Sequence, residues 1–143
     1  MLLLAMTVFS TLGTRPPVKV PRCQTASNTV AFDECLGCER DKSLRALERY
    51  RLAARSKIAR ENPENGRLLG DFDAAQTAWV AYQKAECGAV YTLWQNGTIR
   101  GAMSLRCDIR LTQLRTHQLW STWLVDENGP APSLPEPVVE TGS

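Results

Sequence analysis

Three stretches of the chain place hydrophobic side chains at three- and four-residue steps, a spacing that predicts three amphipathic helices. The stripe of the first stretch consists of Leu44, Leu47, Tyr50, Ala54 and Ile58. The second stretch begins with Asp71, a residue type that often caps a helix. Its stripe, which has Glu86 as a polar exception, consists of Phe72, Ala75, Trp79, Tyr82, Val90 and Leu93.

The third stretch, from residue 102 to residue 125, has hydrophobic residues on two sides of one helix. One side holds Leu105, Ile109, Leu119 and Trp123, and the other holds Cys107, Leu111, Leu114 and Val125. Such a helix is either sandwiched between others or leaves a patch for a partner. Asn, Gly and Pro mark turns at 61–66, 95–97 and 127–132. Since no stretch alternates hydrophobic and polar residues as a strand does, we expect an all-α protein, a small antiparallel bundle of about three helices.

The two ends of the chain differ from this helical part. Residues 1–12 are apolar but too few to cross a bilayer core of about 30 Å, so no stable membrane span is expected. We expect residues 1–22 to be a signal-like apolar segment followed by a Pro-containing linker, although no basic residue precedes the apolar run. The alternative is a buried N-terminal segment of a cytosolic protein. A helical domain at 23–125 and a disordered, acidic, Pro-rich tail at 126–143 complete the predicted organisation.

Two of the five cysteines are placed opposite each other by the predicted hairpin of the second and third helices. Cys87 lies ten residues before Gly97 and Cys107 lies ten residues after it, so both lie about 15 Å from the turn. Facing helix positions at equal height can meet the Cα spacing of a disulfide. We therefore predict a Cys87–Cys107 disulfide that staples the bundle, with two unpaired buried thiols as the alternative.

Only two of the other three cysteines can pair within the chain. The spacing of Cys35 and Cys38 raises the possibility of a redox, haem or zinc site. A redox motif lacks its preceding strand, a haem site would need His where Glu39 stands, and a zinc site has only His117 as a further histidine. No metal or cofactor is therefore expected, and Cys23 is predicted to pair with either Cys35 or Cys38.

Charged residues are unevenly distributed along the chain, although the formal net charge is only +2. Residues 40–60 carry eight basic and two acidic side chains, whereas residues 126–143 carry four acidic side chains and no basic one. A cytosolic basic helical protein that binds nucleic acid through residues 40–60 is therefore one hypothesis. The basic residues are scattered around the helix, and Tyr50 is the single aromatic residue available for base stacking, so a solvated helix is favoured.

Catalytic chemistry has little support in the residue pattern. His117 has no Asp, Ser or Cys close to it in the sequence, and an activated nucleophile needs a base within hydrogen-bond reach. Asp71 and Asp73 lie at a predicted helix start, where carboxylates act as caps. We expect neither an enzyme nor a small-molecule substrate.

The second half of the chain carries a specific motif. Residues 75–87 are AQTAWVAYQKAEC, residues 95–107 are QNGTIRGAMSLRC, and Thr112 and Arg115 follow ahead of Leu119. The motif resembles the lysozyme inhibitor LprI-like family, and the similarity extends over about residues 23 to 120. The upstream matches are Cys23, the triplet Asp33-Glu34-Cys35, Leu47 and Tyr50, whereas Cys38 is additional and Glu48 stands where Asn is usual.

The resemblance implies a small exported bacterial helical domain held by disulfides, in which Cys23 pairs with Cys35 and Cys38 is a free thiol. The matched residues with an expected structural role are Gln76, Trp79, Tyr82, Gly97, Thr112 and Arg115. Gln76 is expected to join a buried polar network rather than a binding site. An ion pair between Arg115 and Glu86 is a further hypothesis.

The family also implies a partner. We expect a periplasmic or secreted protein that binds another protein by steric contact, either a lysozyme or a wall-degrading toxin of a rival. Animal-type lysozymes are strongly basic, and an inhibitor gains association rate from an acidic surface, whereas the folded region here is net positive. The acidic tail or an aromatic patch at Trp120 and Trp123 is the candidate contact surface.

Overall fold

The computed structural model describes residues 22–126 and 128–139 and confirms the all-α prediction. The elements are η1 (Arg22–Thr25), α1 (Thr29–Glu61), α2 (Gly66–Leu93), α3 (Arg100–Leu119) and η2 (Trp120–Leu124), a π-helical continuation of α3. No strand occurs among these residues, and none of their helices is long and apolar enough to cross a membrane. Except for Arg22, the signal-like segment expected at residues 1–22 lies outside the described residues.

Asparagine side chains cap the N-termini of α1 and α2. The Asn28 side chain accepts a hydrogen bond from the Ala31 amide at 2.9 Å, and the Asn65 side chain accepts one from the Leu68 amide at 3.1 Å. Each bond satisfies one backbone N–H that has no partner within the helix. The expectation that the second helix begins at Asp71 is therefore wrong, because Asn65 caps it six residues earlier.

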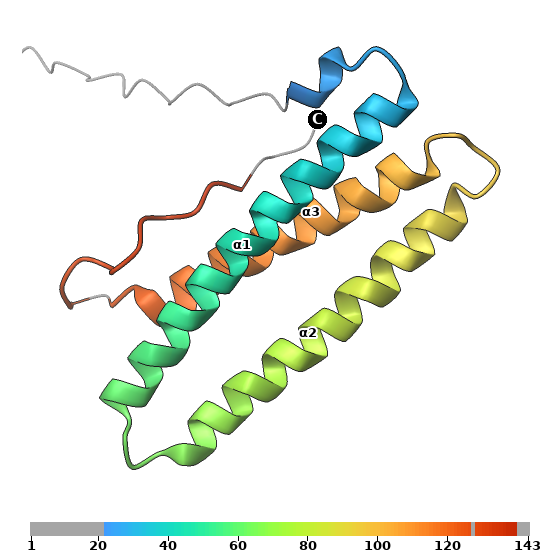
Figure 1. The fold of residues 1–143 in the computed structure, drawn as a ribbon. Helices are drawn as coiled ribbons and strands as arrows, with labels where there is room; N and C mark the ends of the chain where they lie inside the picture. The colour runs from blue at the N-terminus through green and yellow to red at the C-terminus, as the bar shows by residue number, and fades with distance from the viewer. Residues whose placement is uncertain (1–21, 127, 140–143) are drawn as a thin grey trace, which may run out of the picture.

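Helix α3 packs against both α1 and α2, whereas α1 and α2 touch each other little (Figure 1). The two connections are short, so consecutive helices run antiparallel. The core between α1, α2 and α3 is centred on seven buried residues, namely Leu47, Tyr50, Ala54, Ile58, Phe72, Leu119 and Leu124. The predicted stripe of the first helix is confirmed, because four of its five residues belong to this core.

The buried face of α2 differs from the predicted stripe. Its buried residues are Phe72, Gln76, Gln83 and Cys87, whereas Tyr82 is 52% exposed and Leu93 is 78% exposed. The reason is that α2 has one neighbour along most of its length, so only a narrow stripe is covered. The bridge at Cys87 fixes which stripe faces α3.

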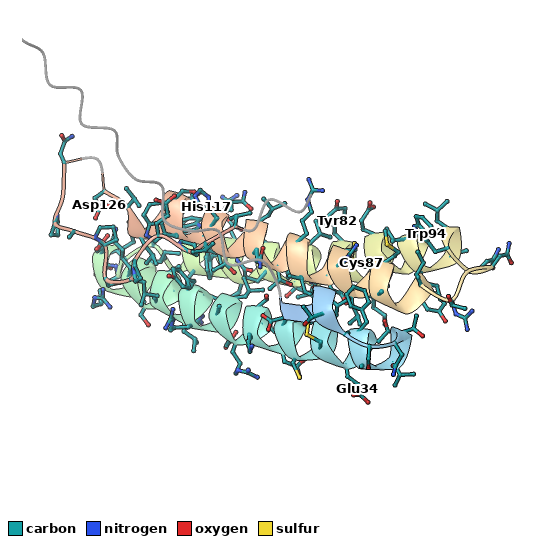
Figure 2. All side chains as sticks on the ribbon, turned by 90° about the horizontal axis from the view of Figure 1, so that it is seen from above. Glu34, Tyr82, Cys87, Trp94, His117 and Asp126 are labelled. Carbon is teal, nitrogen blue, oxygen red and sulfur yellow. A yellow bond between two sulfur atoms is a disulfide. The ribbon has the colours of Figure 1, made fainter. Side chains whose placement is uncertain are left out.

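Both predicted disulfides are present. Cys87 is joined to Cys107 and Cys23 to Cys35, each with the Cα atoms 5.5 Å apart, and Cys38 is free and exposed. Figure 2 shows Cys87 where α2 lies beside α3. One bridge joins α2 to α3, and the other ties η1 to the first turns of α1.

The described part of the tail, residue 126 and residues 128–139, lies against the bundle. The Tyr50 hydroxyl donates a 2.6 Å hydrogen bond to the Pro135 carbonyl, and the Trp120 indole N–H donates one of 3.1 Å to the Leu134 carbonyl. Leu134 also packs against the core. The two aromatic donors are mostly buried and need acceptors, which an extended segment with free carbonyls supplies. Prolines lower the entropy cost of ordering that segment.

We expect Tyr50→Phe to loosen the tail without unfolding the bundle. The change removes the bond to Pro135 and keeps the buried ring, so the free energy of unfolding should fall by about 1 kcal/mol. Amide hydrogen exchange over residues 128–139 should become faster. Tyr82→Phe is the matched control because Tyr82 is half exposed. Unchanged exchange in Tyr50→Phe would contradict the docking of the tail.

Candidate functional site

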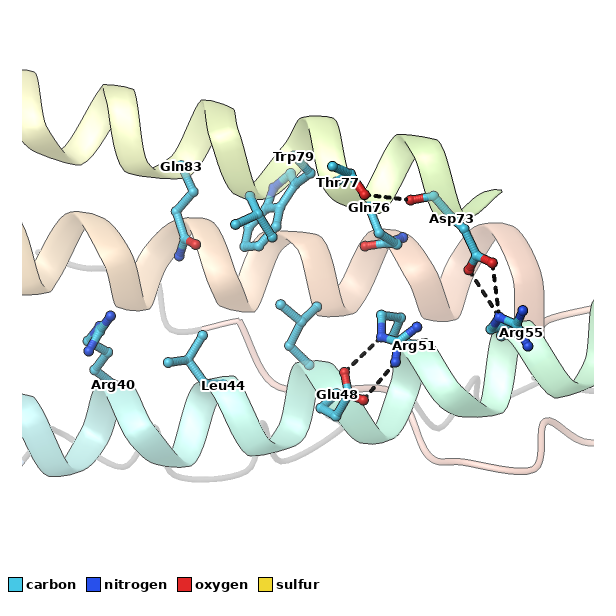
Figure 3. A pocket seen from close by; sticks show the side chains of 12 residues that line it. Arg40, Leu44, Glu48, Arg51, Arg55, Asp73, Gln76, Thr77, Trp79 and Gln83 are labelled. Carbon is cyan, nitrogen blue, oxygen red and sulfur yellow. Dashed lines mark hydrogen bonds and ion pairs between the residues drawn. The ribbon is translucent and has the colours of Figure 1, made fainter. Parts of the chain in front are cut away.

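The divergence of α1 and α2 leaves a groove between them, with a volume of about 700 Å³ (Figure 3). We call it the α1–α2 groove. Its α1 wall is formed by Arg40, Leu44, Leu47, Glu48, Arg51 and Arg55, and its α2 wall by Asp73, Gln76, Thr77, Trp79, Val80 and Gln83. Its size falls in the range of ordinary ligand sites.

Each charged side chain of the groove has a partner of opposite charge. Arg51 donates two 2.7 Å hydrogen bonds to Glu48 one helical turn away, and Arg55 reaches across to Asp73 of α2 at 3.0 Å. The hydrogen bonds from Arg51 hold the pKa of Glu48 below its ordinary value. Arg40 pairs with Asp108 of α3 at 3.1 Å. The groove therefore presents no uncompensated charge of either sign.

Polar contacts join α2 to α3 beside the groove. The Gln83 amide donates to the Thr112 hydroxyl at 2.8 Å and to the Asp108 carbonyl at 3.3 Å, and Thr112 is fully buried. Burial raises the pKa of the Asp108 carboxyl, and Arg40 opposes that rise. Because an unpaired buried polar group is destabilising, these bonds favour the observed rotation of α2 against α3.

Gln76 is the exception to this pairing. Its side-chain oxygen accepts a 3.4 Å hydrogen bond from Arg115, whereas its Nε2 has no partner although the residue is only 7% exposed. Burial lowers the pKa of the Arg115 guanidinium, which also donates to Gln118 at 2.6 Å. The hypothesis of an Arg115–Glu86 pair is wrong, since Glu86 is exposed and Arg115 bonds two glutamines instead.

The six motif residues divide into two groups. Arg115 bonds Gln76 and Thr112 bonds Gln83 where α2 meets α3, and Trp79 on α2 is partly buried. Tyr82 is exposed on α2, and Gly97 lies in the α2–α3 connection, where its amide bonds the Trp94 carbonyl at 2.9 Å. A structural role is consistent with the first group and with Gly97, whereas Tyr82 contributes little to the core.

The predicted aromatic patch is partly covered. Trp123 packs edge-on against Phe72 with ring centroids 5.4 Å apart, and Trp120 contacts the tail through its indole N–H. Both indoles pack against the core. His117 bonds the tail carboxylate of Glu136 at 3.1 Å. Neither indole is therefore free to serve as a flat exposed contact, because the tail and the core occupy these surfaces.

The amino-acid pattern alone does not indicate the α1–α2 groove. The Glu48–Arg51 pair has a local signal, because residues three apart on a helix are neighbours. The Arg55–Asp73 pair has none, because it joins side chains 18 residues apart. Among the described residues, no group of three or more His, Cys, Asp or Glu side chains is arranged to hold a metal ion.

The basic stretch at residues 40–60 is largely neutralised. In this fully described stretch, five of the eight basic side chains pair with carboxylates, namely Arg40, Lys42, Arg51, Arg55 and Lys57. Such pairs reduce the positive potential on which binding to a phosphate backbone depends. The nucleic-acid hypothesis loses its main support.

Comparison with family models gives one finding for this chain. A model described as "Lysozyme inhibitor LprI" matches residues 21–119, from η1 to the end of α3. The match covers both disulfides and both walls of the α1–α2 groove, and it ends before η2 and the tail. Searches among curated proteins and among solved structures returned no match.

Proposed function

Because the chain belongs to the LprI lysozyme inhibitor family, we propose that it is an exported protein of the bacterial cell envelope that binds and inhibits lysozyme. The observation that carries the proposal is the family match over the whole helical bundle. The two disulfides support export, since such bonds form and persist in oxidising compartments such as the periplasm. We propose the helical domain at residues 23–125 as the unit that acts.

Steric contact is the mechanism that we propose. An inhibitor that blocks access needs a rigid surface and no chemical step, and a small bundle held by two disulfides supplies rigidity. No catalytic role is proposed for the single histidine, because His117 is engaged with Glu136 of the tail. The protein is accordingly proposed to be a binding protein and not an enzyme.

Electrostatic steering has only a small part in this proposal. The α1–α2 groove holds paired charges, and residues 40–60 are basic in sum, so a basic lysozyme meets no acidic face there. Attraction between opposite charges speeds association at low salt and weakens as salt screens it. Any inhibition should therefore change by less than about threefold between low and physiological salt.

Lysis of a bacterial cell-wall suspension by an animal-type lysozyme tests the proposal. The oxidised protein is titrated into the assay at low and at physiological salt, and binding is followed in parallel by calorimetry. We expect dose-dependent inhibition that saturates, and the same protein reduced and alkylated is the control. Absence of both inhibition and binding at either salt would reject lysozyme as the partner.

A further inference from the structure

The α1–α2 groove is a preformed feature of the bundle. Its walls cannot close on each other, because α3 lies between α1 and α2 and packs against both. The Cys87–Cys107 bridge and the Gln83–Thr112 hydrogen bond hold α2 in place on α3. The Arg55–Asp73 ion pair connects the walls at one end (Figure 3). The backbone of the groove therefore needs little reordering when a ligand binds, so little conformational entropy is lost there.

A buried hydrogen-bond donor in the groove lacks an acceptor. Gln76 lines the groove, is more than nine-tenths buried, and has an unpaired Nε2. An unpaired buried amide is destabilising, and such groups in folded proteins call for an explanation. Nε2 is shielded from water, so a ligand oxygen that displaces the neighbouring side chains and reaches this nitrogen would supply the missing bond. The complementary group is an acceptor, such as a peptide carbonyl.

Apolar side chains lie beside this donor and complete the recognition surface. Leu44 and Leu47 come from α1, and Trp79 and Val80 from α2. Val80 is 56% exposed, so an apolar ligand group would remove it from water. Because the charges of the groove are already paired, a charged ligand group would find no free counter-charge there. The groove selects an apolar group next to a neutral acceptor.

The unpaired donor favours an extended segment over a helix. The backbone carbonyls inside a helix already accept bonds from its own N–H groups, whereas an extended segment has free carbonyls. From Asp73 to Gln83 the α2 wall spans ten residue steps, or about 15 Å. An extended chain advances about 3.3 Å per residue, so four or five residues would span the wall.

We infer that the α1–α2 groove receives an extended loop of a partner protein, which inserts an apolar side chain between α1 and α2 and places a backbone carbonyl against Gln76 Nε2. This inference rests on the proposed function, because it names the surface through which the protein contacts its partner. It does not require that the partner be lysozyme.

Two variants of the oxidised full chain test the groove. Val80→Arg places a long charged side chain at the apolar wall of the groove. The matched control is Ala78→Arg, which adds the same charge at an exposed position of α2 that does not line the groove. Gln76→Leu removes the unpaired donor and also the oxygen that accepts from Arg115, so its urea midpoint is measured first to establish that the variant is folded. Its readout is the affinity for ligand, which a Gln76 with a structural role alone would leave unchanged in the folded variant.

Random linear peptides displayed on phage are selected on the wild-type protein and then measured against each variant. We expect peptides with an apolar residue whose affinity falls about tenfold or more on Val80→Arg and on Gln76→Leu, and stays the same on Ala78→Arg. Peptides that bind all variants equally, or a selection that yields none, would overturn the inference. Oligomers of N-acetylglucosamine are measured in the same way, and binding of these in place of peptides would also overturn it.

Lysozyme is then measured on the same variants. Binding that is lost in Val80→Arg and in Gln76→Leu but kept in Ala78→Arg would place lysozyme in the α1–α2 groove. If lysozyme binds every variant equally, the proposed function stands and the groove is excluded as its contact. If lysozyme binds none of them while the selected peptides do, the groove stands and lysozyme is excluded as the partner.

Discussion

Replacing Cys87 and Cys107 together with alanine should lower the free energy of unfolding by about 3 kcal/mol. The bridge closes a loop of 20 residues, and the loss of that constraint favours the unfolded chain by roughly this amount. Alanine is used in place of serine because Cys87 is only 2% exposed, and a serine hydroxyl at this buried position would lack a hydrogen-bond partner. Urea unfolding followed by circular dichroism measures the change.

Cys38→Ala is the control for this prediction. Cys38 is exposed and unbridged on α1, so its replacement should change the free energy of unfolding by less than about 0.5 kcal/mol. A double alanine variant that unfolds within about 1 kcal/mol of the wild type would show that the contacts of α2 with α3 suffice without the bridge. Since the bridge also positions the α2 wall, the double variant should lose peptide binding in the α1–α2 groove.

The substitution Leu119→Ala should cost about 3 kcal/mol of stability. Leu119 is completely buried in the core where α3 leads into η2, and truncating a buried leucine removes apolar contacts and leaves a cavity. Differential scanning calorimetry and urea unfolding both measure the loss. At this chain length a destabilisation of that size should lower Tm by roughly 10 °C.

Leu114→Ala tests whether burial, and not residue type, causes the effect. Leu114 lies on the same helix but is 44% exposed, so its truncation should change stability by less than about 1 kcal/mol. Equal losses in the two variants would mean that α3 has another orientation in the bundle. The comparison is informative because the hydrophobic pattern predicts two apolar stripes on α3 and does not indicate which of them is buried.

The hydrophobic pattern predicted the buried stripe of α1 well and that of α2 poorly. Helix α1 packs along its length, so its most apolar side faces the core. Helix α2 instead buries Gln76 and Gln83 and exposes Tyr82. A pattern of apolar residues cannot reveal a face whose glutamines bond Thr112 and Arg115 on another helix.

The tail is a second segment whose structure cannot be predicted from its amino-acid composition. Residues 126–143 are acidic and rich in proline, which is typical of disorder. Acceptors on the tail nonetheless meet the side chains of Tyr50 and Trp120, and Lys57 pairs with Asp126 at 2.9 Å. These partners lie far away in the sequence, so no local pattern could indicate that the tail docks.

The amino-acid sequence by itself determined the three helices, the antiparallel hairpin and the height at which Cys87 and Cys107 face each other. These features depend on local spacing and on the position of a turn. Only the tertiary structure decided which face of α2 is buried, that α1 and α2 leave a groove, and that the tail covers Tyr50 and Trp120. Each of these depends on the groups that distant segments present, because burial and hydrogen bonding are properties of the assembled surfaces.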